Sequence, residues 1–395
     1  MFGERWDRIV AERGAQAALY LADGRAITFH QLDAEARAAR PTGDYVLVQG
    51  EVPQILRQLL AGFLHGVPVQ LVEKDRDRRI PGCPPPAGTA LIKQAVGGSG
   101  VRRCQFFTFD QIAADVDRLH AALDLGSRGA GVAAISCAHS FGLTMTVLQT
   151  LFNGVPTCFA PQPFAQPLME AMRHHPRVFL PGVPALWKAW LMGDVRFDNV
   201  SLAISAGAPL TPALERMAME NHGLKLHNLY GASECGAVSW DETPGLRADG
   251  SDLGTLLPGV QVQTDAAGRL IVISSSVGLG YDESLPEDRY GAGSFTTSDQ
   301  IELQGDRLRF QQCIGAGINV AGRKLSPGEI AEKIMRAAQF DRVNIYGARS
   351  RDPERCQDIV AEVGLPQAEI DGLFKIRACS LLAPWEVPRK WIGKP

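Results

Sequence analysis

Short apolar runs alternate with amphipathic segments through most of the sequence, and this pattern constrains the fold most strongly. Apolar runs of strand length predict β-strands, and the longer segments with a helical repeat of apolar positions predict helices. Alternation of the two is typical of an α/β fold with a mostly parallel sheet. The predicted strands are Tyr45–Gln49, Val67–Val72, Val132–Ser136, Val178–Leu180, Leu202–Ser205 and Leu270–Ser274, and the predicted helices are Val52–Leu64, Phe109–Leu123, Leu143–Leu151, Ala185–Leu191 and Pro212–Asn221.

The length of the chain predicts more than one domain. Its 395 residues exceed the size at which a single hydrophobic core usually stops growing. The segment QQCIGAGIN (311–319) holds two glycines and precedes a compact unit with a helix at Pro327–Ala338 and strands at Val343–Tyr346 and Ile359–Val363. We therefore expect a large N-terminal domain (1–312) and a small α+β C-terminal domain (316–395), with a hinge near 313–317.

Composition and charge exclude several classes of protein. Hydrophobic residues make up 45% of the chain, and 43 acidic and 40 basic side chains leave a net charge of −3. An evenly mixed charge favours neither a nucleic acid nor a membrane surface as a partner. The N-terminus, MFGERWDRIVAERG, is charged throughout, and polar residues interrupt the most apolar stretch (131–160), so neither a secretory signal nor a membrane span is expected. Eight scattered cysteines without a CxxC pair predict no thiolate metal site and a cytoplasmic location.

The segment NLYGASECGAVSWD (228–241) carries the strongest local signal for chemistry. A Tyr-Gly turn followed by a serine and a glutamate brings an aromatic ring, a backbone bend, a hydroxyl and a carboxylate together. Such a set can stack against a base, hold a phosphate oxygen and bind Mg²⁺. Taken alone, the segment is equally compatible with a turn at a strand end that carries a solvated Glu234.

Three further motifs surround this segment in the sequence. LAISAGAPL (202–210) precedes it, and its Gly-Ala-Pro allows a close backbone approach beside a flat ring. SFTTSDQIEL (294–303) follows and contains Asp299, whose carboxylate can accept hydrogen bonds from a ribose diol. INVAGRKLSPGEIAEKI (318–334) comes last, with a glycine turn, a basic pair and a helix that starts at Ser-Pro.

These four motifs, in this order, resemble those of the acyl-adenylate-forming superfamily, which includes acyl-CoA synthetases, aryl-acid ligases and the adenylation domains of peptide synthetases. The resemblance runs from ITFHQLDAEAR (27–37) to VPRKW (387–391). It implies the fold of that superfamily and the use of ATP, with AMP and Mg²⁺ bound during the reaction. It also implies roles for the residues of the motifs: adenine stacking for Tyr230 at the Gly231 turn, a phosphate contact for Ser233, Mg²⁺ binding and catalysis for Glu234, a ribose contact for Asp299, and a nucleotide wall formed by Gly207, Ala208 and Pro209.

The segment AHSFGL (138–143) resembles the part of the family that reaches the carboxylic acid substrate. Peptide-synthetase adenylation domains place an aspartate near this point to pair with the α-amine, whereas this chain has His139 and Ser140. A desolvated ammonium would lack its partner, so a fatty or aromatic acid is expected rather than an amino acid. His139 can alternatively cap a helix. Trp240 is a further candidate for the substrate pocket, with a core position as the alternative.

The sequence departs from the family pattern at three places. In the segment that matches the phosphate loop, AVGGSGVRRC (95–104), a backbone nest and one hydroxyl remain and Arg103 replaces the usual lysine; the cofactor-binding candidates there are Gly97, Gly98, Ser99 and Gly100. Cys313 stands where the family has an arginine before the hinge. Lys394, near the end of VPRKWIGKP, is either the catalytic C-terminal lysine on a shortened tail or a coincidence.

The resemblance and the departures from the family pattern are together compatible with three functions. The first is ATP-dependent activation of a carboxylic acid, followed by transfer to the thiol of coenzyme A or of a carrier protein's phosphopantetheine arm. The second is ATP-independent acyl transfer between coenzyme A and a carrier protein, which tolerates an eroded phosphate loop. The third is a non-catalytic relative that binds an acyl group or a nucleotide.

Overall fold

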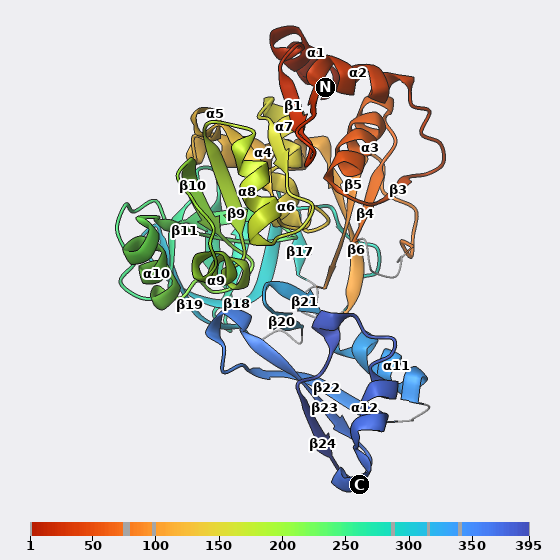
Figure 1. Cartoon of the computed structure of the whole chain (residues 1–395). Coiled ribbons are helices and arrows are strands. Elements are labelled where there is room, and N and C mark those ends of the chain that lie inside the picture. Colours follow the sequence, from red (N-terminus) through yellow and green to blue (C-terminus); the bar gives the residue numbers. More distant parts are fainter. Residues whose placement is uncertain are drawn as a thin grey trace.

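A computed structural model describes residues 2–73, 80–96, 100–285, 289–313, 317–338 and 342–394, without the side chain of Ala95. Figure 1 shows a large part in which helices pack on sheets, with the residues beyond 317 forming a smaller unit beside it. The N-terminus and the C-terminus lie at opposite ends of the molecule in that view. The expected α/β fold class, with a large sheet-rich part and a small C-terminal part, is confirmed.

The largest sheet contains a parallel half and an antiparallel half. Its described strands run in the order β14-β15-β18-β19-β13-β12-β11-β10-β9-β7-β8-β1-β2, and β17 pairs with β18. The strands from β11 to β1 are parallel, whereas those from β12 to β14 are antiparallel. The bounds are β1 Ala17–Tyr20, β2 Ala26–Thr28, β7 Ala130–Ala133, β8 Thr157–Phe159, β9 Val178–Gly182, β10 Val200–Ser205, β11 Leu226–Ala232, β12 Gly236–Trp240, β13 Asp252–Leu256, β14 Gln261–Thr264, β15 Arg269–Ile273, β17 Tyr290–Gly291, β18 Ser294–Gln304 and β19 Arg307–Cys313.

A second sheet has the order β16-β6-β5-β4-β3, with β3, β4 and β5 parallel. Its strands are β3 Val46–Gln49, β4 Val69–Val72, β5 Thr89–Val96, β6 Arg102–Thr108 and β16 Gly280–Tyr281. The helices of the large part are α1 Phe2–Arg13, α2 Phe29–Ala38, α3 Val52–His65, α4 Phe109–Ala122, α5 Leu125–Arg128, α6 Ser140–Met145, α7 Val147–Asn153, α8 Ala165–Arg173, α9 Pro184–Met192 and α10 Pro212–His222.

Local sequence explains the start and the burial of α4, the helix that matters most for the site. Thr108 and Gln111 form a capping box, in which the Gln111 N–H donates to Thr108 Oγ1 (3.3 Å) and the Thr108 N–H donates to Gln111 Oε1 (2.9 Å). Ile112, Asp115 and Leu119 then follow at helical spacing on the buried face. Asp115 and Arg118 are therefore charged residues on a buried face that is otherwise apolar.

Most predicted elements of the large part agree with the structure, but one strand and one helix differ. The strand predicted at Val132–Ser136 is β7, which ends at Ala133. Leu143–Leu151 was expected to be continuous, but α6 ends at Met145 and α7 begins at Val147. Thr146 interrupts them with φ −127° and ψ −84°, and its hydroxyl donates to the Gly142 carbonyl (2.6 Å). This bend aims the residues of α6 toward the interior of the large part.

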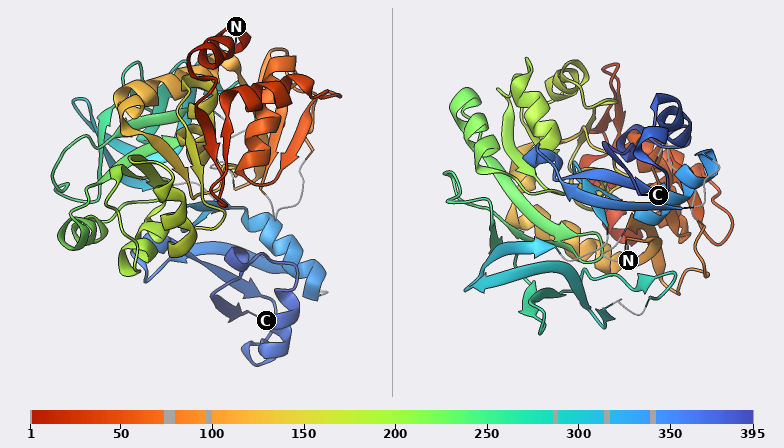
Figure 2. Two further views of the ribbon diagram at one scale, coloured as in Figure 1. Left: turned by 45° about the horizontal axis from the view of Figure 1, so that its top comes forward. Right: turned by 90° about the horizontal axis from the view of Figure 1, so that it is seen from below.

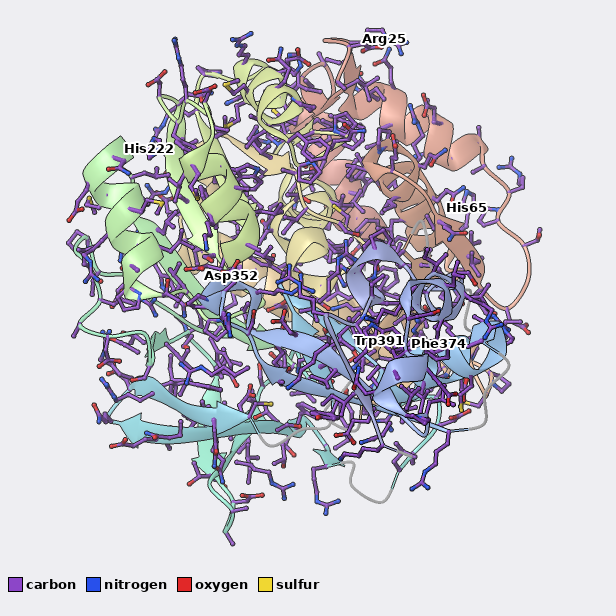
Figure 3. The ribbon with its side chains drawn as sticks, turned by 60° about the horizontal axis from the view of Figure 1, so that its bottom comes forward. Arg25, His65, His222, Asp352, Phe374 and Trp391 are labelled. Atoms are coloured by element: carbon purple, nitrogen blue, oxygen red, sulfur yellow. The ribbon has the colours of Figure 1, made fainter. Side chains whose placement is uncertain are left out.

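The C-terminal unit has its own hydrophobic core. Its buried side chains come from residues 318–378 and include Ile330 and Ile359. Phe374 and Trp391 meet edge to face, with ring centroids 5.9 Å apart, and Figure 3 labels both in this unit. Its elements are β20 Ile318–Val320, β21 Arg323–Leu325, α11 Pro327–Ala338, β22 Val343–Arg349, β23 Gln357–Val363, α12 Gly372–Ala378 and β24 Lys390–Gly393, with short 3₁₀ turns at Pro353–Arg355, Gln367–Glu369 and Pro384–Glu386.

Ion pairs link the C-terminal unit to the large part. Arg102 on β6 pairs with Glu329 on α11 (2.5 Å), and Lys188 on α9 pairs with Asp352 (3.0 Å) and Glu354 (3.1 Å). Figure 2 shows the unit against one side of the large part from two directions. Part of the expected hinge, residues 314–316, lies outside the described residues, so the hinge and the domain boundaries remain predictions. Every described helix is too short or too polar to cross a membrane.

Candidate active site

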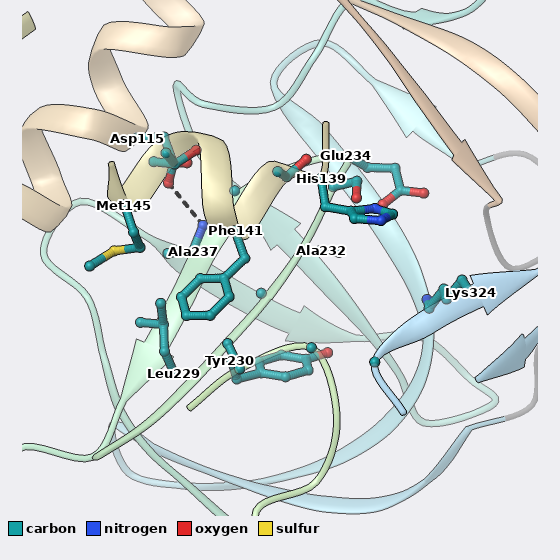
Figure 4. Close-up of a pocket in the computed structure, with 18 of the residues that line it drawn as sticks. Asp115, His139, Phe141, Met145, Leu229, Tyr230, Ala232, Glu234, Ala237 and Lys324 are labelled. Atoms are coloured by element: carbon teal, nitrogen blue, oxygen red, sulfur yellow. Dashed lines mark hydrogen bonds between the residues drawn. The ribbon is translucent and has the colours of Figure 1, made fainter. Parts of the chain in front are cut away.

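A cavity of about 190 Å³ opens where the two sheets and the C-terminal unit meet. Its walls come from β5, β6, α4, α6, the loop after β10, the β11–β12 hairpin and the β20–β21 turn. Figure 4 shows two ends: Asp115, Met145 and Leu229 lie on one side, and Glu234, His139 and Lys324 on the other.

The structure brings about half of the predicted site residues into the cavity lining, namely Gly207, Tyr230, Gly231, Ser233, Glu234, His139 and Ser140. The β11–β12 hairpin explains the position of several of them. A Cβ atom on Gly231 would lie 2.4 Å from the Gly236 carbonyl oxygen, so the close turn requires a glycine there. Gly97, Gly98 and Ser99 lie outside the described residues.

Other predicted residues lie elsewhere. Ala208 and Pro209 follow Gly207 but do not line the cavity, and neither does Gly100, which is buried. Trp240, at the end of β12, packs beside His227 (ring centroids 5.4 Å apart) rather than in the cavity lining. Trp240 is partly buried and packs against the hydrophobic core of the large part.

Tyr230 is held by Asp299. The phenolic hydroxyl donates a 2.8 Å hydrogen bond to Asp299 Oδ2, and this bond ties β11 to β18. Burial, and then the charge of Asp299, raises the pKa of Tyr230 well above its usual value, so the hydroxyl stays protonated and remains a donor. Asp299 does not line the cavity itself, but it is hydrogen-bonded to Tyr230, which does.

Tyr281 contacts both Glu234 and Arg103. The Tyr281 hydroxyl donates to Glu234 Oε1 (2.6 Å), and the Arg103 guanidinium lies over the Tyr281 ring, 3.6 Å from its centroid. Arg103 also donates to the Glu283 carbonyl (2.9 Å) and is almost completely buried. The prediction that Arg103 contacts phosphate in the cavity is not met, because its cation–π contact holds the guanidinium outside the lining.

Two basic side chains near the C-terminal unit do line the cavity. Arg102, next to the predicted Arg103, lies in the wall and is tied to Glu329. Lys324 enters from β21. Desolvation lowers the pKa of Lys324, but the carboxylates of Glu234 and Asp299 outweigh this effect and raise the pKa above its usual value. Lys324 is therefore a protonated cation at the Glu234 end.

His139 belongs to an ionic cluster that spans both parts of the chain. Its Nε2 atom lies 3.3 Å from Glu73 Oε1, and the same carboxylate pairs with Arg323 of the C-terminal unit. The Arg323 guanidinium also lies over the Trp385 ring, 4.2 Å from its centroid. His139 occupies the N-cap position of α6 without a side-chain capping bond, so the capping alternative is not what the structure shows.

Lys394 is far from the cavity. It follows β24 and pairs with Glu362 (2.8 Å) in the outer sheet of the C-terminal unit, with 66% of its side chain exposed. Figure 1 places the C-terminus at the end of this unit that points away from the large part. Lys394 therefore does not lie where a catalytic lysine would have to lie. Its position agrees with the alternative that the Gly-Lys at the end of the sequence matches the family motif by coincidence.

Comparison with known proteins agrees with this geometry. Residues 100–281 match the family model described as AMP-binding enzyme. A curated relative, 4-hydroxybutyrate–CoA ligase 1 of Metallosphaera sedula, is 23% identical over 233 residues, which cover 52% of this chain and 40% of the relative. The family model thus matches slightly less than half of the chain, and this match supports the resemblance to the acyl-adenylate-forming superfamily.

Solved structures show the same fold over nearly the whole chain. A double mutant of o-succinylbenzoate CoA synthetase from Bacillus subtilis, bound to a product analogue, has a TM-score of 0.79 at 14% identity and covers 99% of this chain and 94% of that one. The amide bond synthetase McbA from Marinactinospora thermotolerans has a TM-score of 0.78 at 16% identity and covers 99% of this chain and 95% of that one. The structural match to the adenylate-forming fold therefore includes the C-terminal unit.

Sequence reasoning missed several cavity residues. Lys324 belongs to the basic pair of the motif GRKLSPGE. Its position directly after a glycine turn was the sequence feature that could have predicted its place in the cavity. Asp115 was signalled only by being an acidic residue on the apolar face of α4. Phe141, Thr144 and Met145 carried no signal beyond their apolar neighbourhood, since their access to the cavity depends on the bend at Thr146.

Proposed function

We propose that this protein activates a carboxylic acid with ATP, forms an acyl-adenylate, and passes the acyl group to a thiol. One observation carries the proposal: a single cavity joins a polar end, with Glu234 and Lys324, to a mostly apolar end at Leu119 and Met145. A nucleotide phosphate suits the first end, and the body of an organic acid suits the second. Tyr230, held by Asp299, provides an aromatic face beside them.

In the proposed reaction the acid carboxylate attacks the α-phosphorus of ATP and pyrophosphate leaves. Negative charge on the phosphate oxygens then requires positively charged groups and hydrogen-bond donors. Lys324 and Arg102 supply cationic groups in the cavity wall. Ser233 supplies a hydroxyl at the turn before Glu234.

The residues at the polar end fit a magnesium ion. Glu234 lies in the cavity wall, and one of its oxygens accepts from Tyr281, which leaves the other oxygen for a metal. Among the described residues no group of three or more acidic, histidine or cysteine side chains forms a metal cage. Mg²⁺ suits such a site because it is commonly held by one carboxylate together with substrate phosphates and water. When bound, the ion neutralises phosphate charge as a Lewis acid.

The acceptor in the second step is proposed to be coenzyme A or the phosphopantetheine arm of a carrier protein. A thiol must reach the acyl-adenylate from the surface, and the β20–β21 turn borders the route on the side of the C-terminal unit. Gly207 and Gly322 face each other there: a Cβ on Gly207 would lie 3.8 Å from the Gly322 carbonyl. The absence of side chains on these two glycines therefore lets the loop and the turn approach each other closely at this border of the cavity.

A second candidate is acyl transfer between two thioesters without ATP. The specific observation in its favour is the position of Arg103 and Lys394, because the two cations that the resemblance assigns to phosphate chemistry both lie outside the cavity lining. A thioester exchange would not need them.

A paired assay separates the two functions. The purified chain is incubated with a panel of fatty and aromatic acids, ATP, Mg²⁺ and coenzyme A, and AMP release is measured. A parallel reaction contains the acyl-CoA and pantetheine but no ATP. Acid-dependent AMP release that Glu234→Ala abolishes supports activation. Transfer without ATP that is unaffected by Glu234→Ala contradicts it and supports the second candidate.

A further inference from the structure

The apolar end of the cavity contains a buried carboxylate that the proposed activation chemistry does not use. Asp115 on α4 has only 7% of its surface exposed, and it lines the cavity together with Thr144. Figure 4 places Asp115 at the opposite end from Lys324. Burying a charged group among apolar side chains costs free energy unless hydrogen bonds or opposite charges compensate for it. The contacts of Asp115 therefore show what the group can recognise.

The β11–β12 hairpin fixes the position of Asp115. Its Oδ1 atom accepts a 2.9 Å hydrogen bond from the Ala237 N–H. A Cβ atom on Gly236, which has φ +76°, would come within 2.4 Å of the same oxygen. Burial raises the pKa of Asp115, and the Ala237 N–H, the nearby basic groups and the Thr144 hydroxyl act against this effect. The two oxygens of a carboxyl group offer several acceptor positions, so these partners leave acceptor capacity for a ligand in the cavity.

The charges around Asp115 favour a neutral partner over a cationic one. Arg118 Nη1 lies 4.0 Å from Asp115 Oδ1, and the positive charge of Lys93 also acts on this carboxylate. Arg118 is held in place by Ser274 Oγ (2.7 Å) and Ser276 Oγ (3.0 Å). Because Arg118 and Lys93 already lie near this buried carboxyl group, and because burial raises its pKa, the site gives a substrate ammonium group no uncompensated negative charge to pair with. A hydroxyl donates a hydrogen bond without adding charge.

On the basis of the activation proposed above, we propose that the acid substrate carries a hydroxyl group at the end away from its carboxylate, and that Asp115 accepts a hydrogen bond from this hydroxyl. The apolar side chains of Leu119, Phe141, Met145 and Leu229 enclose the body of the acid between its two polar ends. The substrate class is thus a small hydroxylated aromatic or aliphatic carboxylic acid. Asp115 acts as a specificity-determining residue, and it takes no part in the attack on ATP.

Calorimetric titration of the whole chain tests this inference without nucleotide. The probes are two matched pairs: 4-hydroxybenzoate with benzoate, and 6-hydroxyhexanoate with hexanoate. A hydrogen bond to a buried acceptor, which the unsubstituted acid leaves without this donor, predicts that the hydroxylated member of at least one pair binds ~10–100-fold more tightly. The pair that shows the preference distinguishes an aromatic from an aliphatic substrate. Equal or absent binding of both members in both pairs overturns the inference.

Variants of Asp115 identify the acceptor. Asp115→Ala should abolish the preference, whereas Asp115→Asn, which keeps an acceptor oxygen, should retain part of it. Asp117→Asn is the matched control, since Asp117 lies on the same helix but pairs with Arg5 at the surface (2.5 Å). If Asp115→Ala fails to fold, the inference is tested with a third ligand that binds to the wild-type chain. Tighter binding of the cationic 4-(aminomethyl)benzoate than of 4-hydroxybenzoate overturns the inference.

The titration also separates this inference from the proposed activation. A preference for the hydroxylated acid without any ATP-dependent turnover supports the role of Asp115 and contradicts activation. Turnover of hydroxylated and unsubstituted acids with equal efficiency supports activation and overturns the role of Asp115.

Discussion

The phenolic oxygen of Tyr230 lies 2.8 Å from Oδ2 of Asp299, so the aromatic residue predicted to stack on adenine is bonded to the carboxylate predicted to hold ribose. The two groups come from β11 and β18, about 70 residues apart in sequence, and β12, β13 and β19 lie between them in the sheet. A ribose hydroxyl that donates to Oδ2 of Asp299 would compete with Tyr230 for this oxygen.

This competition predicts the effect of removing the hydroxyl. Tyr230→Phe keeps the ring but leaves Asp299 without this donor, so a ribose diol gains a better acceptor. We expect AMP to bind several-fold more tightly to Tyr230→Phe, because a hydrogen bond to a charged group contributes about 1.5–3 kcal/mol. Asp299→Ala should weaken AMP binding by ~10-fold or more. Weaker AMP binding by Tyr230→Phe in a calorimetric titration would show that the hydroxyl itself contacts the nucleotide.

Lys324 is predicted to supply the main positive charge at the polar end of the cavity. Lys324→Met should lower the rate of acid activation ~10²–10³-fold, as expected for loss of one group that stabilises a developing charge. Lys324→Arg should recover part of the rate, since it keeps the charge with a different shape. The comparison variant is Lys390→Met, which removes an exposed lysine on β24. Unchanged kcat in Lys324→Met would remove Lys324 from the reaction.

The Arg102–Glu329 pair is predicted to hold the C-terminal unit against the large part. Arg102 is 6% exposed and Glu329 is 31% exposed, so Glu329→Gln leaves a nearly buried guanidinium with a weaker partner. We expect the unit to separate about tenfold more often, which corresponds to about 1.4 kcal/mol. Limited proteolysis should then cut faster between the two parts. Glu332→Gln, on the exposed side of α11, serves as the control, and identical cleavage rates for all three chains would contradict the prediction.

Acid should destabilise the fold through a buried ion network under β11. Burial opposes the ionisation of Asp241, but hydrogen bonds from Lys225 (2.7 Å) and Thr243 (2.5 Å) outweigh it and lower the pKa of Asp241. Its contribution to stability is therefore present above the unfolded pKa of about 3.9 and is lost as the pH falls through the lower folded value.

The Asp241 network is tested by denaturant unfolding as a function of pH. Asp241→Asn should lower the free energy of unfolding at pH 7 by roughly 1–3 kcal/mol and make it fall less steeply below about pH 4. The measurement is a series of urea unfolding curves from pH 7 down to pH 2.5. An equally steep fall in the wild type and in Asp241→Asn would mean that other carboxylates carry the acid sensitivity.

Much of the fold was predictable because its signals are local. The apolar runs of β9 and β10, the cap of α4 and the start of α11 at Pro327 all lie in short stretches of sequence. The β11 motif likewise predicted Tyr230 and Glu234 in one cavity. The position of Arg103 was not predictable, because it depends on Tyr281, which reaches it only through the pairing of β16 with β6. Asp115 and Lys324 needed the approach of three separate elements before their relation to the cavity could be seen.

The central claim is that this cavity forms an acyl-adenylate, and ATP–pyrophosphate exchange measures that step most directly. Labelled pyrophosphate is incubated with the whole chain, ATP, Mg²⁺ and each acid of a panel that includes 4-hydroxybenzoate and 6-hydroxyhexanoate. We predict that label enters ATP only when a suitable acid is present, and that Glu234→Ala loses this exchange. No exchange with any acid by a chain that is folded and binds both acid and nucleotide would contradict acid activation.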